Sequence, residues 1–343
     1  MYFFIVWLRN KLFDWKILKS KKFDIPIISV GNITVGGTGK TPHIEYFIRE
    51  FASKKVAVLS RGYKRKTSGF VLADENCNAQ TIGDEPYQIY KKFPEILVAV
   101  DEKRVRGIEK LLALPHPPEV ILLDDAFQHR YVTPSDNILL INYNRPIFND
   151  KILPYGRLRE PISAIKRADK VIITKCPQNL SEKEKNYFIE KINHYCHCGL
   201  DPQSPQKKEI AGQARNDENI YFSTFKYSIP KNIFTQKPMS IDSKRNFLVV
   251  TGVVNVAGMY DYLQNFAEKI YKMEFADHHD FTEKDIKKIA LAFDFAQAPH
   301  SATDPECLII TTEKDRARLL DNSFISNELK EKMFYVEIEV DFL

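Results

Sequence analysis

The sequence predicts an α/β protein with a doubly wound parallel sheet, a second and smaller α/β lobe, and an N-terminal helix. Three observations lead to this prediction. Short apolar runs of four to six residues alternate with helical segments, which is typical of parallel strands buried on both faces. Four of the 13 glycines fall within residues 31–39, between one such run and a helix. The chain of 343 residues is long enough for two cores, and its apolar content of 44% is that of a globular protein.

The N-terminal segment, residues 1–24, is expected to form a cationic helix on a membrane surface. Residues 1–22 contain six basic residues and one acidic residue, so they account for the whole net charge of +5. The segment also holds both tryptophans, Trp7 and Trp15, within a broad apolar stripe. Its apolar run is too short to span a bilayer, and its composition is typical of a helix in the membrane plane. The alternative is a helix that packs on the protein's own core.

The stretch VGNITVGGTGKT, residues 30–41, follows an apolar run, precedes a helix, and predicts a phosphate-binding loop. Backbone N–H groups converge on phosphate oxygens where positive-φ turns and missing Cβ atoms allow it. Lys40 is expected to reach the β- and γ-phosphates, and Thr41 to offer its hydroxyl to Mg²⁺. The strict motif has glycine where this chain has Thr34. The fold class is therefore expected to be of the P-loop NTPase type, with nucleotide contacts at Thr34, Val35, Gly36, Gly37, Thr38, Gly39, Lys40 and Thr41.

The remaining elements divide the chain into a larger domain, 25–198, a linker and a smaller lobe, 245–343. In the larger domain, helices are expected at 40–51 and from 84, and strands at 56–60, 70–72, 96–100, 120–123, 138–141 and 171–174. Residues 199–244 are expected to be an insertion and linker, because 199–218 combine prolines, glycines and mixed charge without periodicity. The smaller lobe repeats the alternation, with helices at 256–266 and 283–293 and strands at 247–250, 270–275, 308–311 and 336–340.

Charged residues follow several of the expected strands. Asp124 and Asp125 end a buried strand, where P-loop enzymes hold Mg²⁺ directly or through water; the alternative is an acidic surface turn. Asp84, in GDEP, either caps the following helix or acts as a general base toward a hydroxyl nucleophile. The basic run 61–66 follows another strand end and favours a phosphorylated substrate.

Seven motifs, in order, resemble the tetraacyldisaccharide 4'-kinase (lipid A 4'-kinase) family. They are GNITVGGTGKTP, SRGYKRK, GDEP, DDAFQH, LREP at 158–161, DHHDF at 277–281 and TEKD at 312–315. The resemblance runs from about residue 1 to the C-terminal end. It implies a peripheral kinase at the cytoplasmic face of the bacterial inner membrane. Such an enzyme uses Mg-ATP to phosphorylate the 4'-hydroxyl of tetraacyldisaccharide 1-phosphate, forming lipid IVA in lipid A biosynthesis.

The resemblance also implies roles for individual residues. Asp84 is expected to be the general base, with His278 polarising it, and Lys40 to act on the transferred phosphate. Thr41, Asp124 and Asp125 are expected to hold Mg²⁺. Contacts to the disaccharide, or to the groups that order its site, are expected from Tyr63, Arg104, Arg159 and Glu160. The chain departs from the family pattern at Lys64, where a small residue is usual, and in 199–218.

Other functions fit the sequence less well. A membrane-recruited P-loop ATPase of the partitioning or division-site type is the main alternative, but such proteins carry a signature lysine where this chain has Val35. A GTPase would need a guanine-reading aspartate where Pro177 follows the TKC of residues 174–176. A non-enzymatic lipid-binding protein has little use for paired carboxylates beside a phosphate loop. The expected partners are the lipid substrate and the anionic inner-membrane surface, without nucleic acid. Five irregularly spaced cysteines, in a chain without a cleavable signal, favour reduced thiols.

Overall fold

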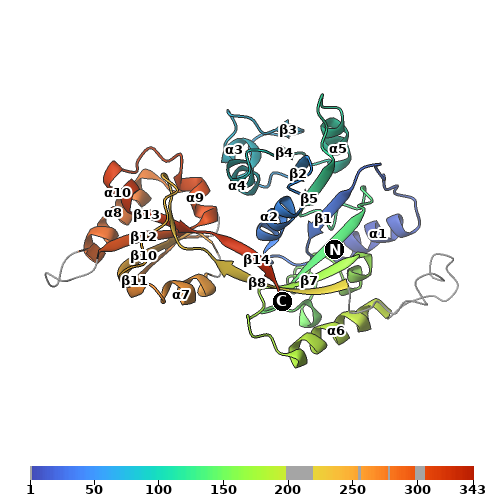
Figure 1. Ribbon diagram of the computed structural model, residues 1–343. Coiled ribbons are helices and arrows are strands. Elements are labelled where there is room, and N and C mark those ends of the chain that lie inside the picture. The colour runs from blue at the N-terminus through green and yellow to red at the C-terminus, as the bar shows by residue number, and fades with distance from the viewer. Residues whose placement is uncertain (1, 198–218, 254–255, 277–278, 298–305) are drawn as a thin grey trace. The chain divides into compact units, whose positions relative to one another are not determined.

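The computed structural model describes residues 2–197, 219–253, 256–276, 279–297 and 306–343. They form two compact units, coloured by residue number in Figure 1. Unit 1 comprises Met1–Cys77, Ile89–Phe225 and Val340–Leu343, and unit 2 comprises Asn78–Gln88 and Lys226–Glu339. These unit boundaries are set by contacts between segments that are distant in the sequence. The unit boundaries therefore differ from the expected domain boundaries, most clearly at Asn78–Gln88, which belong to unit 2.

Unit 1 is built on a nine-stranded sheet with the strand order β14-β8-β7-β6-β1-β5-β2-β4-β3. The neighbours from β8 to β4 run parallel, and β3 is antiparallel to β4. The strands are β1 (Ile27–Gly31), β2 (Val56–Ser60), β3 (Val71–Leu72), β4 (Leu97–Val100), β5 (Val120–Asp124), β6 (Asp136–Asn142), β7 (Lys170–Thr174), β8 (Ile220–Tyr227) and β14 (Ile338–Phe342). Because β1 lies between β5 and β6, the loops that follow these three strands emerge at one edge of the sheet.

Helices pack on both faces of this sheet, because alternate strand residues point to opposite sides. Val58 packs with Ile44 and Ile48 of α2 in one cluster, whereas its neighbour Leu59 packs with Ile108 of α5 in another. The helices are α1 (Tyr2–Asp14), α2 (Lys40–Glu50), α4 (Asp84–Lys92), α5 (Arg104–Leu112) and α6 (Glu182–His197), with 3₁₀ turns η1 (Ile147–Asn149) and η2 (Ile162–Arg167). This arrangement confirms the expected α/β class with a large, mostly parallel sheet.

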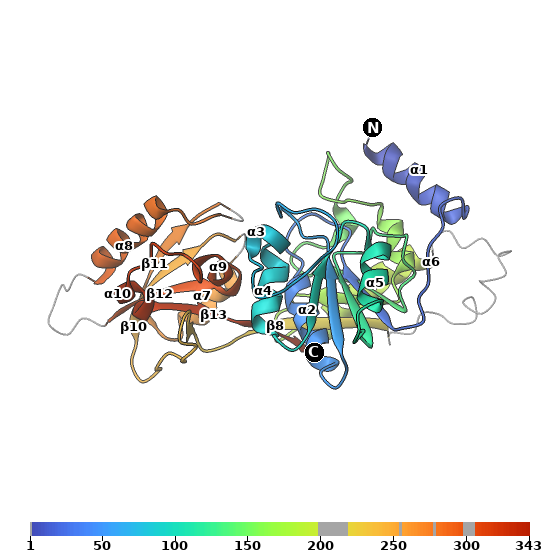
Figure 2. The same ribbon diagram turned by 90° about the horizontal axis from the view of Figure 1, so that it is seen from above.

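Helix α1 lies at the edge of unit 1, as Figure 2 shows. Its buried residue is Phe13, near the C-terminal end of the helix. The first two turns carry exposed apolar side chains, namely Tyr2, Phe3, Phe4, Ile5, Trp7 and Leu8. The helix ends at Asp14, so Trp15 lies beyond it. Within the part of the chain that the structure describes, none of the helices combines the length and apolar character needed to span a bilayer.

Unit 2 contains a five-stranded sheet with the strand order β11-β10-β12-β13-β9. The first four strands run parallel, and β9 is antiparallel to β13. The strands are β9 (Lys231–Asn232), β10 (Arg245–Thr251), β11 (Ala267–Glu274), β12 (Cys307–Thr312) and β13 (Met333–Val336). The helices are α3 (Ala79–Ile82), α7 (Ala257–Leu263), α8 (Glu283–Gln297), α9 (Glu313–Leu319) and α10 (Asn327–Lys332). Ile286 and Ile289 of α8 and Leu319 of α9 pack in one apolar cluster with Leu248 of β10.

Two features of the sheets differ from the expectations. Strand β8 lies in residues 199–244, which were expected to form a linker, and it pairs with β7 in the sheet of unit 1. The strand expected at 336–340 is two strands, because the chain leaves β13 at Val336 and enters β14 at Ile338 in the other sheet. Residues 199–218 lie outside the described residues. The rest of this segment, 219–244, also contains β9.

Candidate active site

The loop between β1 and α2 needs glycine at two positions for steric reasons. Gly39, the N-cap of α2, has a φ of 83°, and a Cβ on it would lie 2.6 Å from Cζ of Phe225. Gly31 ends β1, and a Cβ there would lie 2.8 Å from Cβ of Phe127. Any side chain at either position would displace a neighbour or strain the backbone. The packing of Phe127 and Phe225 therefore explains part of the unusual glycine density.

Side chains from neighbouring strands fix the carbonyl groups of this loop. Thr174, at the end of β7, donates its hydroxyl to the carbonyl of Thr38 at 2.9 Å, and Asn142, at the end of β6, donates to the carbonyl of Gly37 at 3.3 Å. Buried Asn32 donates to the hydroxyl of Thr38 at 2.7 Å. Among the described residues, the N–H groups of positions 36–39 have no hydrogen-bond partner. Successive free N–H donors beside a helix N-terminus form an anion-binding arrangement.

Asp125 lies beside Lys40 at the end of β5. The Lys40 Nζ is 3.7 Å from Oδ1 of Asp125, and Nη1 of Arg159 is 3.0 Å from Oδ2. Asp125 itself has a positive φ of 48°. Burial acts to raise the pKa of Asp125, but the charges of Lys40 and Arg159 outweigh it and hold that pKa below its ordinary value. The carboxylate is therefore ionised and links three of the expected site residues.

Arg104, at the start of α5, is buried behind this group. Its Nη1 donates to the carbonyl of Asp101 at 2.6 Å, and its Nη2 donates to the carbonyl of Asp124 at 3.4 Å. Burial lowers the pKa of Arg104 to about 10, although Asp124 and Asp125 act to raise it. Among the residues that the structure describes, its buried Nε has no hydrogen-bond partner. Asp124 is also buried and pairs in register with Val30 of β1, so it lies next to the start of the glycine-rich loop.

Glu160 connects the LREP segment to α1. It is 1% exposed, and its Oε2 accepts from Arg167 at 2.8 Å and from Asn10 at 3.2 Å. Helix α1 contacts neighbouring motifs as well, since the Tyr2 hydroxyl donates to the carbonyl of Arg159 at 3.1 Å. Arg9 likewise donates to the carbonyl of Gln128 at 2.8 Å. The helix therefore contacts the same segments that supply Arg159 and Asp125.

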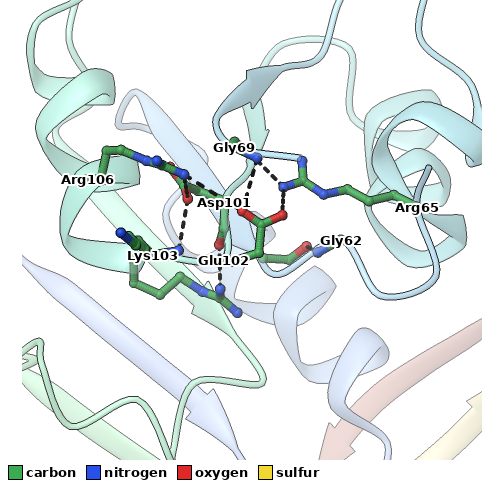
Figure 3. Close-up of polar contacts among 9 residues, drawn as sticks. Gly62, Arg65, Gly69, Asp101, Glu102, Lys103 and Arg106 are labelled. Atoms are coloured by element: carbon green, nitrogen blue, oxygen red, sulfur yellow. Dashed lines mark hydrogen bonds and ion pairs between the residues drawn. The ribbon is translucent and has the colours of Figure 1, made fainter. Parts of the chain in front are cut away.

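One residue of the basic run 61–66 is turned inward (Figure 3). Arg65 donates to Glu102 and, at 2.6 Å, to the carbonyl of Gly69, while the N–H of Gly69 donates to Glu102 at 3.0 Å. Burial acts to raise the pKa of Glu102, but the bonds from Arg65 and Gly69 outweigh it and lower that pKa. We call the Arg65–Glu102–Gly69 contacts the loop clasp. They fix the second half of the loop to Glu102, while Tyr63, earlier in the loop, is 68% exposed.

A second network supports the strand end from which Glu102 projects. Asp101 is fully buried and accepts from Nε and Nη2 of Arg106 at 2.8 and 2.7 Å, and from the N–H of Lys103 at 2.8 Å. These contacts appear beside the loop clasp in Figure 3. A bidentate arginine is a geometrically specific partner for a carboxylate. The start of α5, and with it Arg104, is therefore held in a defined position.

Asp84 lies in unit 2, at the start of α4. Its Oδ2 accepts from Nη2 and Nε of Arg318 at 2.7 and 3.1 Å. Arg318 is in turn held by Asp315 of the TEKD motif at 2.9 Å, and Asp315 accepts from the N–H of Gly252 at 2.9 Å. The neighbouring Glu85 pairs with Lys314 at 3.2 Å. Two sequence motifs far apart in the chain, GDEP and TEKD, thus form one charged network.

His278, the expected partner of Asp84, lies outside the described residues. The next histidine, His279, contacts Asp285 at 3.0 Å and stacks on Phe275 with ring centroids 4.7 Å apart. A hydrogen bond from Thr282 is the main cause that lowers the pKa of Asp285 to about 2.

Sequence reasoning missed His43, which supports the glycine-rich loop from α2. Its Nδ1 is 2.7 Å from the carbonyl of Gly39, and its Nε2 is 3.0 Å from the hydroxyl of Ser223 in β8. Burial lowers the pKa of His43 to about 4, against the raising effect of the Gly39 contact. The only local signal was a polar residue next to Ile44 on the buried face of α2. Ser223 is 180 residues away in the sequence, which no local pattern connects to the loop.

Comparisons with known proteins agree with this architecture. The chain matches the family described as tetraacyldisaccharide-1-P 4'-kinase over residues 1–342. A tetraacyldisaccharide 4'-kinase from Bacteroides thetaiotaomicron is 42% identical, with 99% of this chain and 86% of that protein covered. One from Phocaeicola vulgatus is 44% identical, with 98% and 87% covered. A crystal structure of "apo" form LpxK from Aquifex aeolicus in complex with ATP aligns with a TM-score of 0.67 and 28% identity, covering 100% of this chain and 92% of that one.

An α/β fold with such a loop between a central strand and a helix is suited to bind a phosphate group, and the named relatives define the class of the chain as a kinase. The chain belongs to the tetraacyldisaccharide-1-P 4'-kinase family. The expected function of a lipid A 4'-kinase is thereby confirmed, and the comparisons give no support to a partitioning or division-site ATPase.

Proposed function

We propose that this kinase transfers the γ-phosphoryl group of ATP to the 4'-hydroxyl of tetraacyldisaccharide 1-phosphate, at a membrane surface, and so forms lipid IVA. The observation that carries this proposal is the set of free N–H donors at 36–39 next to Lys40. It supports a polyphosphate ligand held in a P-loop. The crystallised Aquifex aeolicus relative is described in complex with ATP, which supports ATP as that ligand.

The nucleotide is proposed to bind along residues 34–41. Lys40 neutralises charge on the transferred phosphate, and its side chain is available for this because its contact with Asp125 is long, at 3.7 Å. Thr41, Asp124 and Asp125 fit Mg²⁺, since hydroxyl and carboxylate oxygens are the donors that this ion prefers. Their positions also suit the role, because Asp124 ends β5, which pairs with β1 directly before the loop, and Thr41 lies in the first turn of α2 directly after it. When bound, Mg²⁺ would neutralise negative charge on the phosphates of the nucleotide.

Asp84 is proposed as the general base that takes the proton of the 4'-hydroxyl as the phosphoryl group transfers. Arg318 orients the carboxylate by two donors to one oxygen, Oδ2, at 2.7 and 3.1 Å. Such a fixed carboxylate suits an in-line transfer, in which positioning and electrostatics supply most of the rate. His278 remains the proposed partner that polarises Asp84.

The substrate side is proposed to include Tyr63, Arg104, Arg159 and Glu160. Exposed Tyr63 and the ion pair of Arg159 with Asp125 support contact with the phosphorylated sugar. Glu160 is buried and bonded to Arg167 and Asn10, which supports an ordering role. The exposed apolar turns of α1 support insertion into the interface of the cytoplasmic leaflet, with the basic residues of 1–22 facing anionic lipid headgroups.

A phosphoryl-transfer assay tests the proposal. Purified protein is incubated with γ-labelled ATP, Mg²⁺ and tetraacyldisaccharide 1-phosphate in detergent micelles, alongside Lys40→Ala and the control Lys183→Ala, an exposed lysine of α6. We expect label in a bis-phosphorylated lipid with the wild type and the control, and none with Lys40→Ala. Unlabelled lipid together with ATP hydrolysis by the wild type would overturn the proposal.

A further inference from the structure

Two cations reach the glycine-rich loop from strands that the proposed function does not use. Arg145 follows β6, in a turn closed by its N–H to the carbonyl of Asn142 at 3.1 Å, and Lys175 directly follows β7. Nη2 of Arg145 lies 3.5 Å from the position that a Cβ on Gly36 would take. Nζ of Lys175 lies 3.9 Å from the corresponding position on Gly37. The two charges therefore lie against neighbouring glycines of the loop.

In the portion of the chain that the structure describes, neither Arg145 nor Lys175 forms an ion pair with an acidic side chain. The Lys175 ammonium also lies over the ring of Phe225, whose centroid is 5.7 Å away. Burial and the charge of Arg145 lower the pKa of Lys175. Two like charges are thus held near one another, with Lys175 partly buried and Arg145 exposed, at a cost to the ligand-free protein.

The backbone adds a further cost at the same place. Lys175 has a φ of 60°, in the left-handed region that a residue with a Cβ enters only at an energetic cost. Asn142, in the turn that carries Arg145, also donates to the carbonyl of Gly37, so this turn is fixed to the loop. A solvated surface lysine would need neither the strained backbone nor the burial. The arrangement is explained by an anion that both side chains bind together.

We propose that Arg145 and Lys175 form a second cationic arm of the nucleotide site, which binds the phosphate oxygens of ATP in addition to Lys40 and the loop N–H groups. This inference rests on the proposed function. It also assigns a role to the TKCP segment at 174–177, whose Pro177 replaces the aspartate that would read guanine. Lys175 of this segment binds the polyphosphate, so the arm selects nucleotides by their number of phosphate groups.

Nucleotide binding and thermal unfolding of single variants test the inference. Arg145→Gln and Lys175→Met are compared with Lys183→Met, the matched change of an exposed lysine on α6. Calorimetric titration with ATP, ADP and AMP in the presence of Mg²⁺ gives the affinities, and the melting temperature of the ligand-free protein reports on structure. A charge-assisted hydrogen bond to phosphate predicts roughly ten- to hundredfold weaker binding of ATP in each arm variant.

The expected pattern has three parts. ATP binding weakens, AMP binding changes much less, and the ligand-free melting temperature stays the same or rises because a repulsive charge is gone. Arg145→Lys should recover part of the affinity. Wild-type ATP affinity in both variants would overturn the inference, and so would a lower ligand-free melting temperature with equal losses for ATP and AMP. If Lys40→Ala loses ATP binding but the arm variants do not, this inference alone fails. If the variants behave as expected but the wild type labels no lipid, the proposed acceptor alone fails.

Discussion

Acidification should destabilise unit 1 through His43, and replacing this residue with glutamine should remove that sensitivity. His43 is fully buried, and its Nδ1 faces the carbonyl of Gly39, so the neutral ring donates from Nδ1 and accepts at Nε2 from Ser223. A proton on Nε2 reverses the second bond, so that Ser223 accepts it and can donate its hydroxyl to the carbonyl of Ile173 at 3.4 Å. The cost of protonation is therefore the burial of a charge in an apolar environment that includes Phe225 and Phe342.

The size of the effect follows from the pKa of His43, which is lowered from 6.5 to about 4. Because the pKa of His43 is lower in the folded protein than in the unfolded one, the stabilising contribution of His43 is fully present above pH 6.5. This contribution is lost as pH falls from 6.5 toward 4. The unfolded state binds the proton over this range, which removes up to about 1.4 kcal/mol for each pH unit. At about pH 5 the free energy of unfolding should be lower by about 2 kcal/mol for this residue alone.

Urea unfolding at neutral pH and at about pH 5, with wild type and His43→Gln, measures this difference. The variant should be less stable at neutral pH, since it loses well-aligned buried hydrogen bonds, but it should lose about 2 kcal/mol less on acidification. His129, whose pKa is also lowered to about 4, chiefly by burial, is present in both proteins, so its contribution cancels. Equal losses of unfolding free energy in the two proteins would refute the reasoning.

Three further predictions concern the other parts of the site. Asp84→Ala should lower kcat by orders of magnitude with little change in the KM for ATP, and near-normal turnover would remove Asp84 from the chemistry. Glu102→Gln should open the loop clasp and raise the KM for the lipid roughly tenfold, while the KM for ATP stays unchanged. Steady-state kinetics measure both constants, with Lys183→Ala as control. An unaltered KM for the lipid would exclude a role for the loop clasp in substrate binding. Replacing Trp7 with serine should weaken binding to anionic vesicles roughly tenfold in a sedimentation assay. Undiminished binding would show that α1 is not the membrane contact.

Local sequence patterns predicted the strands around the loop well. Apolar runs located β2 at its observed bounds and β5 and β7 to within one residue, because parallel strands buried on both faces need continuous apolar side chains. The same criterion failed for β13 and β14. Apolar residues continue from β13 into β14, where they alternate with acidic ones, and the single residue Glu337 between the two strands is enough for the chain to change sheets. A change of sheet leaves no periodic signal.

The site residues divide in a similar way. Gly39, Lys40 and Asp125 could be proposed from position alone, because strand ends in a parallel sheet share one edge. The inward turn of Arg65 could not, since nothing in its neighbours distinguishes it from Lys64 or Lys66. Its orientation depends on Glu102, which comes from another strand end. Long-range pairs of this kind, like His43 with Ser223, are set by tertiary packing rather than by local pattern.

The pairing of β14 with β8 makes unit 1 discontinuous along the chain, and this has a consequence for folding during synthesis. The ribosome releases β8 well before β14, because almost all of unit 2 is encoded between them. In the meantime β8 is an edge strand with one row of N–H and C=O groups open to pairing with other chains. A nascent chain that stalls within unit 2 therefore exposes a template for aggregation. The C-terminal strand Ile338–Phe342 closes this edge, so variants that weaken it should affect yield in cells more than they affect catalysis.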